Sequence, residues 1–231
     1  MPAGYSFRPR AWALALAALA CAAFVALGHW QSRRAEEKRL QGARHEQALK
    51  SPPAQVSPAA GAPDLVHRRV IASGRFLPQY TVLLDNKLRH GRAGYEVVTP
   101  LKLGDSDLHV LVARGWIEAV PARDVPRVRT PAGEVRIEGI GLARLPRAFA
   151  LGKEAAGPVR QNLDVESFVA ETGLALKTLV IEQHSAGEDG LLREWPRPDA
   201  GIEKHESYAL QWYSLAALAI VLAAVLSFRR K

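Results

Sequence analysis

The chain has 231 residues and a formal net charge of +8, with 31 Lys and Arg residues against 23 Asp and Glu residues. Much of this basic excess lies beside two long apolar segments, where basic residues set membrane topology, so we expect no nucleic-acid partner. Cys21 is the only cysteine and lies inside the first apolar segment. The remainder of the chain therefore has no disulfide, no thiol chemistry and no thiolate metal site.

Two apolar segments bracket the chain. One runs from Ala11 to Trp30, and the other carries no charged side chain from Ser207 to Phe228. At about 1.5 Å per helical residue, such lengths match the roughly 30 Å hydrocarbon thickness of a bilayer. We predict membrane-spanning helices at 11–30 and 204–228, in contact with membrane lipid.

The charged flanks of these segments predict the topology. Arg229, Arg230 and Lys231 place the C-terminus in the cytoplasm, because positive flanks stay on that side. Two spans then put residues 1–10 on the same side and the central domain on the outer face. The apolar run continues past Cys21 to Leu27, which is typical of a retained anchor rather than of a cleaved leader.

Between the spans the sequence pattern changes twice. Residues 31–50 mix Arg, Glu, Lys and Gln, which predicts a juxtamembrane helix that continues out of the membrane. Four prolines follow within Ser51–Pro63, and they predict an extended Pro/Ala linker over residues 51–64. Residues 65–203 then form one domain.

This domain is rich in β-branched, leucine and aromatic residues separated by Pro, Gly and Asp. The pattern predicts strands at Arg69–Phe76, Tyr80–Leu88, Tyr95–Leu103, Leu108–Ile117, Val135–Leu142 and Leu176–Gln183. A helix is expected to start at Asp164, whose side chain can cap it, and to end by Gly173. The fold class is an α+β membrane protein, with two transmembrane helices flanking one domain built on an antiparallel sheet or small barrel with one embedded helix.

No catalytic constellation stands out in the sequence. We find no nucleophile paired with a base, no metal cluster and no phosphate loop, so we expect a protein that is not an enzyme and assign no catalytic residue. Glu203 and Glu206 flank His205, but beside a membrane they are better interpreted as the solvated lip of the second span.

Two histidines differ from the others because each lies at the outer end of a predicted span. His205 precedes Tyr208 and Trp212 at helical spacing, and His29 precedes Trp30. An ordinary interfacial belt of aromatic residues accounts for this arrangement. The sharper alternative is an apolar slot between the helices that holds haem, with an imidazole reaching the iron.

Five blocks of residues carry a resemblance that decides between these alternatives. They are Gly28-His29-Trp30-Gln31-x-x-Arg34-x-x-x-Lys38, Gly74-x-Phe76, Gly94-Tyr95-x-Val97-Val98-Thr99-Pro100-Leu101, Leu111-Val112-Ala113-Arg114-Gly115-Trp116 and His205-x-x-Tyr208-Ala209-Leu210-Gln211-Trp212-Tyr213. In this order, and together with both spans, they resemble the Surfeit locus protein 1 family. The blocks cover nearly the whole chain.

The resemblance implies an assembly factor for haem-copper cytochrome c oxidase of the respiratory chain. Such a chaperone would sit in the bacterial inner membrane with its domain in the periplasm, take haem a from haem a synthase and pass it to oxidase subunit I. The family places a histidine at the entrance of the second span, here His205, as a ligand of the haem iron. The cofactor-binding residues we expect are His205, Tyr208, Trp212, His29 and Trp30, and the family does not require a histidine at position 29.

A scaffold that docks subunit I without binding haem is the alternative. Its partner-binding residues would be Gly94, Tyr95, Arg114, Gly115 and Trp116, because Arg and Trp are frequent at the energetic centres of interfaces. Trp116 at the end of a strand is equally consistent with a core position. A membrane-anchored hydrolase is disfavoured by the missing nucleophile and base.

The chain also departs from the family pattern at three places. Ala113 stands where members usually have Asn before Arg-Gly-Trp, and Glu203 stands where an Asn usually lies two residues before the histidine. The region Phe149–Arg160 lacks the usual Pro and Asn pattern. These positions bear on the details of the site.

Overall fold

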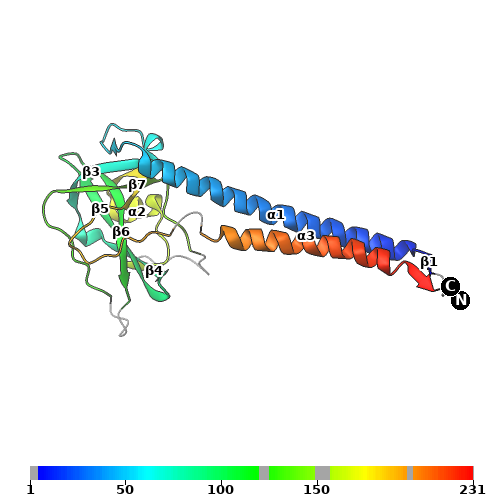
Figure 1. Ribbon diagram of the computed structural model, residues 1–231. Coiled ribbons are helices and arrows are strands. Elements are labelled where there is room, and N and C mark those ends of the chain that lie inside the picture. Colours follow the sequence, from blue (N-terminus) through cyan, green and yellow to red (C-terminus); the bar gives the residue numbers. More distant parts are fainter. Residues whose placement is uncertain (1–4, 120–124, 149–156, 197–199, 231) are drawn as a thin grey trace. The chain divides into compact units, whose positions relative to one another are not determined.

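The computed structural model describes residues 5–119, 125–148, 157–196 and 200–230 (Figure 1). The chain divides into two units, and each is described by itself. A helical unit contains residues 1–43 and 197–231, and a β-rich unit contains residues 44–196. The family departure at Phe149–Arg160 lies mostly outside the described residues. Residues 120–124, in the connection between the strands that end at Glu118 and begin at Val135, lie outside them as well.

Two antiparallel helices make the helical unit. Helix α1 spans Ala11–Lys50, about 60 Å at 1.5 Å per residue, and α3 spans Ile202–Val225. A short ribbon joins the chain ends, because β1 (Tyr5–Phe7) pairs antiparallel with β10 (Phe228–Arg230). The predicted helical continuation to Lys50 is confirmed.

The two helices face one another with small side chains and turn large ones outward. Gly28, Ala35, Ala209 and Ala216 are buried, whereas Leu19, Leu210 and most other large apolar side chains of both helices are exposed. Both helices are long and apolar enough to cross a membrane, and only 6% and 11% of their apolar windows are buried. That outward apolar surface is the reverse of a water-soluble helix pair, whose large apolar side chains face inward.

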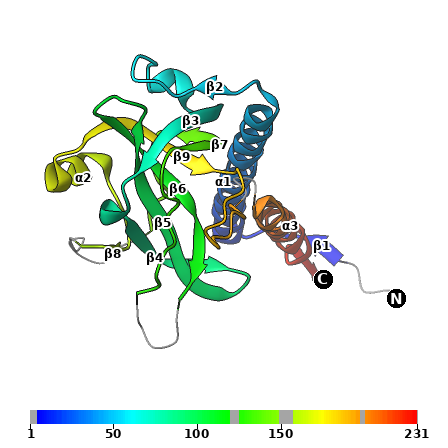
Figure 2. The same cartoon turned by 90° about the vertical axis from the view of Figure 1, so that its left-hand side faces the viewer.

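The β-rich unit is built on one sheet that closes on itself (Figure 2). The sheet order is β2-β3-β7-β9-β6-β5-β4-β8, and β3 also pairs with β5. Strands β3, β7, β9, β6 and β5 therefore form a closed barrel. The bounds are β2 Ala54–Gln55, β3 Arg69–Phe76, β4 Val82–Arg89, β5 Arg92–Leu103, β6 Leu108–Glu118, β7 Val135–Leu142, β8 Val159–Arg160 and β9 Ala175–Gln183, with short 3₁₀ turns at Pro63–Leu65 and Pro78–Tyr80.

Gly74 lies where the barrel closes. It pairs with Leu103 of β5, beside the Arg75–Lys102 and Phe76–Leu101 pairs. A Cβ atom on Gly74 would lie 1.8 Å from the carbonyl oxygen of Lys102, so only glycine allows the two backbones to approach this closely.

The sheet is mixed, which corrects the prediction of an antiparallel one. β9 runs antiparallel to β7 and parallel to β6, and β2 and β8 also pair in parallel with β3 and β4. The chain between β6 and β9 includes β7, β8 and α2, a crossover long enough for parallel pairing. Because β9 enters between β7 and β6, these two strands are consecutive in the chain but are not neighbours in the sheet.

The predicted linker is part of the domain. Ala54 and Gln55 form β2 on the edge of the sheet, and Val56 is buried in the barrel interior. Lys177 of β9 donates hydrogen bonds to the carbonyl oxygens of Pro58, at 3.3 Å, and Ala60, at 2.6 Å. The prolines prevent a helix here, as expected, but the extended chain is fastened to the barrel.

The embedded helix α2 spans Val165–Thr172 and ends at Gly173 in the left-handed conformation, as predicted. Phe168 anchors it in a buried cluster with Leu84, Leu111 and Val180 on the outer face of the strands. The predicted side-chain cap is wrong. The carboxylate of Asp164 accepts instead from Arg147, at 2.7 Å, and from the Ser167 hydroxyl, at 3.4 Å.

Candidate functional site

His205 lies in the first turn of α3, on the face that α3 turns toward α1. Its Nδ1 atom is 2.7 Å from Oε1 of Gln31 on α1. An amide oxygen only accepts hydrogen bonds, so Nδ1 carries the proton and donates it to Gln31. In the neutral ring, Nε2 is then the unprotonated nitrogen, which is the form that can bind a metal ion.

Gly28 and Tyr213 pack together one turn of α1 away from Gln31. A Cβ on Gly28 would lie 2.6 Å from the Tyr213 ring, so the glycine makes room for that ring. The Tyr213 hydroxyl is 3.5 Å from the Ser32 hydroxyl, and the ring stands perpendicular to the His29 ring at a centroid distance of 6.0 Å. Tyr213 thus packs its ring over Gly28 of α1 while remaining 36% exposed.

Trp212, the neighbour of Tyr213 in α3, also packs against α1. Its ring stacks on Phe24 of α1 with centroids 5.8 Å apart and an interplanar angle of 25°. Together with Tyr213 it gives the region below His205 an aromatic lining.

Polar contacts fasten the start of α3 to α1. The ammonium group of Lys38 donates to the carbonyl oxygen of Ala200 at 2.6 Å, immediately before the helix begins. Arg39 forms an ion pair with Glu206, the neighbour of His205. Gly28, Gln31, Ala35 and Lys38 recur at intervals of three and four, so they lie on one face of α1.

The structure places the five residues predicted to bind a cofactor in different surroundings. His205 and Trp212 lie on the face toward α1, whereas Tyr208 and Trp30 are each 52% exposed. His29 contacts Tyr213, and His205 is bonded to Gln31. Sequence reasoning named no role for Gln31 or Tyr213. The signal was present, because the spacing of Gly28, Gln31 and Lys38 marks a single helix face.

The Arg-Gly-Trp motif lies inside the β-rich unit, at the end of β6. Arg114 is fully buried and donates to Asp189 Oδ2 at 2.9 Å, to the Thr130 hydroxyl at 2.8 Å and to the Arg129 carbonyl at 2.8 Å. Its guanidinium also lies 4.8 Å above the ring centre of Phe76. Arg114 therefore stabilises the domain from within.

Asp189 is the centre of a buried charge cluster with Arg114 and Arg193. Burial alone would raise the pKa of Asp189, but hydrogen bonds from Arg193 and Arg114 outweigh it and hold the pKa below its ordinary value. Burial lowers the pKa of the Arg114 guanidinium, and the bond to Asp189 opposes that shift. Both groups are charged at neutral pH, so the pair fixes the segment that contains Asp189.

Trp116 fastens the same segment further along. Its backbone exchanges two hydrogen bonds with Leu192, and its indole nitrogen donates to the Lys87 carbonyl at 2.8 Å. The ring is 7% exposed and covers Gly94, and a Cβ on Gly94 would lie 2.4 Å from it.

The residues predicted to bind a partner are largely internal. Arg114, Trp116, Gly94 and Gly115 are buried, and Tyr95 is half-buried. Trp116 occupies the core position that was the alternative for it, and docking of a partner at these residues stays a prediction.

Comparison with known proteins identifies the family of the chain. A model of the SURF1 family matches residues 18–217. The chain belongs to the SURF1 family. It is 29% identical over 207 residues to a SURF1-like protein of Rickettsia bellii, covering 86% of this chain and 83% of that relative. An uncharacterized SURF1-like protein of Mycobacterium tuberculosis is 27% identical over 227 residues, covering 93% of this chain and 82% of its own.

A third relative has a more informative name. The cytochrome oxidase assembly protein SHY1 of Saccharomyces cerevisiae is 30% identical over 129 residues, which cover 52% of this chain and 33% of the yeast protein.

The two departures from the SURF1 pattern that can be located lie in different places. Glu203 is exposed in the first turn of α3. Ala113 lines a cavity of about 310 Å³ in the β-rich unit, with Glu96, Arg89 and Trp195 among its other walls. Glu96 is buried there and bonded to Arg89 at 2.7 Å. An asparagine at position 113 would add a polar group to this cavity.

Proposed function

We propose that this SURF1-family chain is a membrane-anchored assembly factor for haem-copper cytochrome c oxidase, and that His205 binds haem a while it passes from haem a synthase to oxidase subunit I. The assembly role is supported by the family and by the likeness to the yeast protein named for cytochrome oxidase assembly. The two outward-facing apolar helices support the membrane anchor.

The observation that carries the haem assignment is the bond between His205 Nδ1 and Gln31 Oε1. A metal-binding histidine commonly donates its other ring N–H to a carbonyl or carboxylate, which fixes the tautomer and the orientation of the ring. Gln31 supplies that acceptor here. His205 is half-buried, so its ring is partly shielded from solvent without being sealed in.

The residues around His205 suit a ligand that must be released again. Haem a would supply an iron atom, and His205 would give it one imidazole ligand. One protein ligand binds the iron less tightly than a pair of histidines would. Trp212, Tyr213 and Phe24 offer apolar aromatic surface next to it. We assign the ligand to His205 alone, because His29 is turned to Tyr213.

The membrane topology is part of the proposal. Residues 1–10 and 229–231 lie in the cytoplasm, and the β-rich unit lies in the periplasm of a bacterial inner membrane. Five basic residues and no acidic one lie within 1–10 and 228–231, which favours retention of these ends on the cytoplasmic side. Reporter fusions at the two chain ends and at residue 106 test this arrangement, and a cytoplasmic signal from residue 106 would contradict it.

The haem assignment is tested by purifying the full chain from cells that make haem a and measuring haem per protein from the absorbance spectrum. We expect haem in the wild-type protein and its loss in His205→Ala. His90→Ala is the matched control, because His90 is exposed in a β turn of the other unit. Wild-type protein without haem, or equal loading in His205→Ala, would refute the assignment.

His29→Ala, purified in the same way, separates one histidine from two. Loading equal to wild type is expected if His205 is the sole protein ligand. Loss of haem equal to that of His205→Ala would show that both histidines are needed.

A further inference from the structure

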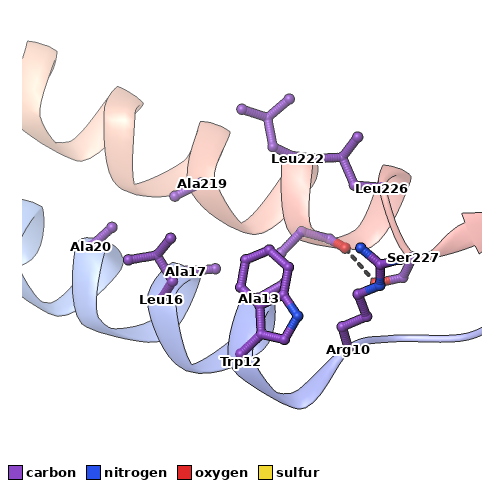
Figure 3. Close-up of a pocket in the computed structure, with 11 residues that line it drawn as sticks. Arg10, Trp12, Ala13, Leu16, Ala17, Ala20, Ala219, Leu222, Leu226 and Ser227 are labelled. Atoms are coloured by element: carbon purple, nitrogen blue, oxygen red, sulfur yellow. Dashed lines mark hydrogen bonds between the residues drawn. The ribbon is translucent and has the colours of Figure 1, made fainter.

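A groove lies between α1 and α3 at the end of the helical unit where the two chain ends meet (Figure 3). Its volume is about 450 Å³. The walls come from both helices, and they are Arg10, Trp12, Ala13, Leu16, Ala17, Ala20, Ala219, Leu222, Ala223, Leu226 and Ser227.

Alanines create this space. Ala13, Ala17 and Ala20 on α1 and Ala219 and Ala223 on α3 recur at intervals of three or four, so each set lies on one helix face. Their side chains are too short to fill the gap between the backbones, and Figure 3 shows the stubs of Ala17 and Ala219 directed into it. An unfilled apolar gap loses the dispersion contacts of its lining, so an apolar occupant is favoured.

One end of the groove is strongly basic. Arg10 lines this end, and the residues close in sequence to Arg10 and Ser227 include Arg8, Arg229, Arg230 and Lys231. Residues 1–35 and 207–231 contain no acidic residue. Within the described parts of the chain, no side chain or carbonyl accepts a hydrogen bond from the Arg10 guanidinium. The other polar wall, Ser227, already donates to the Ala223 carbonyl at 2.6 Å. Arg10 is therefore available to an external anion.

We propose that this groove binds one anionic phospholipid, with an acyl chain between the two rows of alanines and the phosphate on Arg10. The apolar walls suit the acyl chain, and the unopposed positive charge suits an anionic headgroup. A helix of a partner protein is about 10 Å wide and does not enter a groove of this volume. The site is separate from His205, which lies at the opposite end of α3.

The test uses the full chain purified in detergent and analysed by native mass spectrometry after exposure to phosphatidylglycerol or phosphatidylcholine vesicles. We expect one phosphatidylglycerol retained per chain, and much less phosphatidylcholine. Ala17→Leu with Ala223→Leu fills the groove and should abolish retention. The matched control is Ala15→Leu with Ala224→Leu, which changes exposed alanines that do not line the groove.

Arg10→Gln separates the headgroup from the acyl chain. One basic residue near a membrane surface contributes about 1 kcal/mol, so the preference for phosphatidylglycerol should fall about fivefold in this variant, with lipid still retained. Equal retention by the groove-filling and control variants would overturn the proposal, as would a headgroup preference unchanged by Arg10→Gln. A lipid-free dimer would overturn it too, because the groove would then be filled by a second copy of the chain. The measurement requires no haem, so its failure leaves the role of His205 unaffected.

Discussion

Gln31→Leu is the sharpest test of how His205 is prepared for haem. The substitution removes the acceptor 2.7 Å from Nδ1 and keeps a side chain of similar size on the same helix face. His205 remains in place but loses the bond that fixes its tautomer and ring orientation. We therefore expect the variant to fold as wild type and to bind haem a more weakly.

The size of the effect distinguishes two roles for Gln31. A single neutral hydrogen bond contributes about 1 kcal/mol, which corresponds to about a fivefold loss of affinity. Loss of the hydrogen-bond acceptor of a metal-binding histidine typically lowers affinity for the metal about ten- to a hundredfold. A loss above tenfold would thus show that orientation of the ring matters beyond the bond itself. Gln31→Glu should restore binding, because a carboxylate accepts the same hydrogen bond and makes the imidazole a stronger donor to the iron.

The assay combines haem loading with the midpoint potential of the bound haem. Gln31→Glu is expected to lower the potential relative to wild type, since a more basic ligand stabilises the oxidised iron, and a purely structural role would not shift it. Gln41→Leu is the control, because Gln41 is an exposed glutamine of the same helix. Haem loading and potential unchanged in both Gln31 variants, with loading lost in His205→Ala, would refute the role of Gln31.

Three further outcomes follow from the packing. Asp189→Ala leaves Arg114 buried without its partner and should lower the free energy of unfolding by about 3–5 kcal/mol in urea titrations, an effect far larger than that of a surface charge. The pKa of Asp189 is lower in the folded state, so this stabilisation is present above the unfolded pKa of about 3.9 and is lost as pH falls through the folded pKa. In Asp189→Asn, the free energy of unfolding should therefore fall less steeply with decreasing pH in this acidic range. Gly28→Leu should push the helices apart at Tyr213 and lower the free energy of unfolding by about 1–3 kcal/mol. Adding Tyr213→Ala should restore part of this free energy, and adding Tyr208→Ala should restore none.

Local pattern was enough to predict most elements of the fold. The bounds expected for β3 and β7 match the structure, and α2 ends at Gly173 as expected. These elements are defined by alternation, prolines and glycines within a few residues. Barrel closure depends on contacts between strands remote in sequence, such as Gly74 with Leu103. The parallel pairing of β9 with β6 is of the same kind, and neither periodicity nor turn residues specify it.

For each contact in the candidate site, the sequence predicted one of the two residues and left its partner unidentified. Helical spacing identified His205 as the histidine at the entrance of the second apolar helix. It did not identify Gln31, because a pattern within one helix does not say which residue of another helix stands opposite. Arg114 illustrates the same limit. Arginine is usually exposed, and its burial here depends on Asp189, which lies 75 residues further along the chain.

Each of two family motifs fastens a neighbouring part of the chain within its own unit. In the β-rich unit, Arg114 holds Asp189 and Trp116 holds Leu192, before that unit ends at Pro196. In the helical unit, Lys38 holds Ala200 one turn before His205.

Lys38 thus bears on where α3 begins, whereas Arg114 stabilises the β-rich unit. Lys38→Met should therefore reduce haem loading without touching the proposed ligand, whereas Arg114→Met should lower the stability of the β-rich unit. Lys38→Met acts on the helix start directly, because it removes the donor to the Ala200 carbonyl. Hydrogen exchange of the α3 amides separates the two, because only Lys38→Met should increase exchange in its first turn when the β-rich unit stays folded.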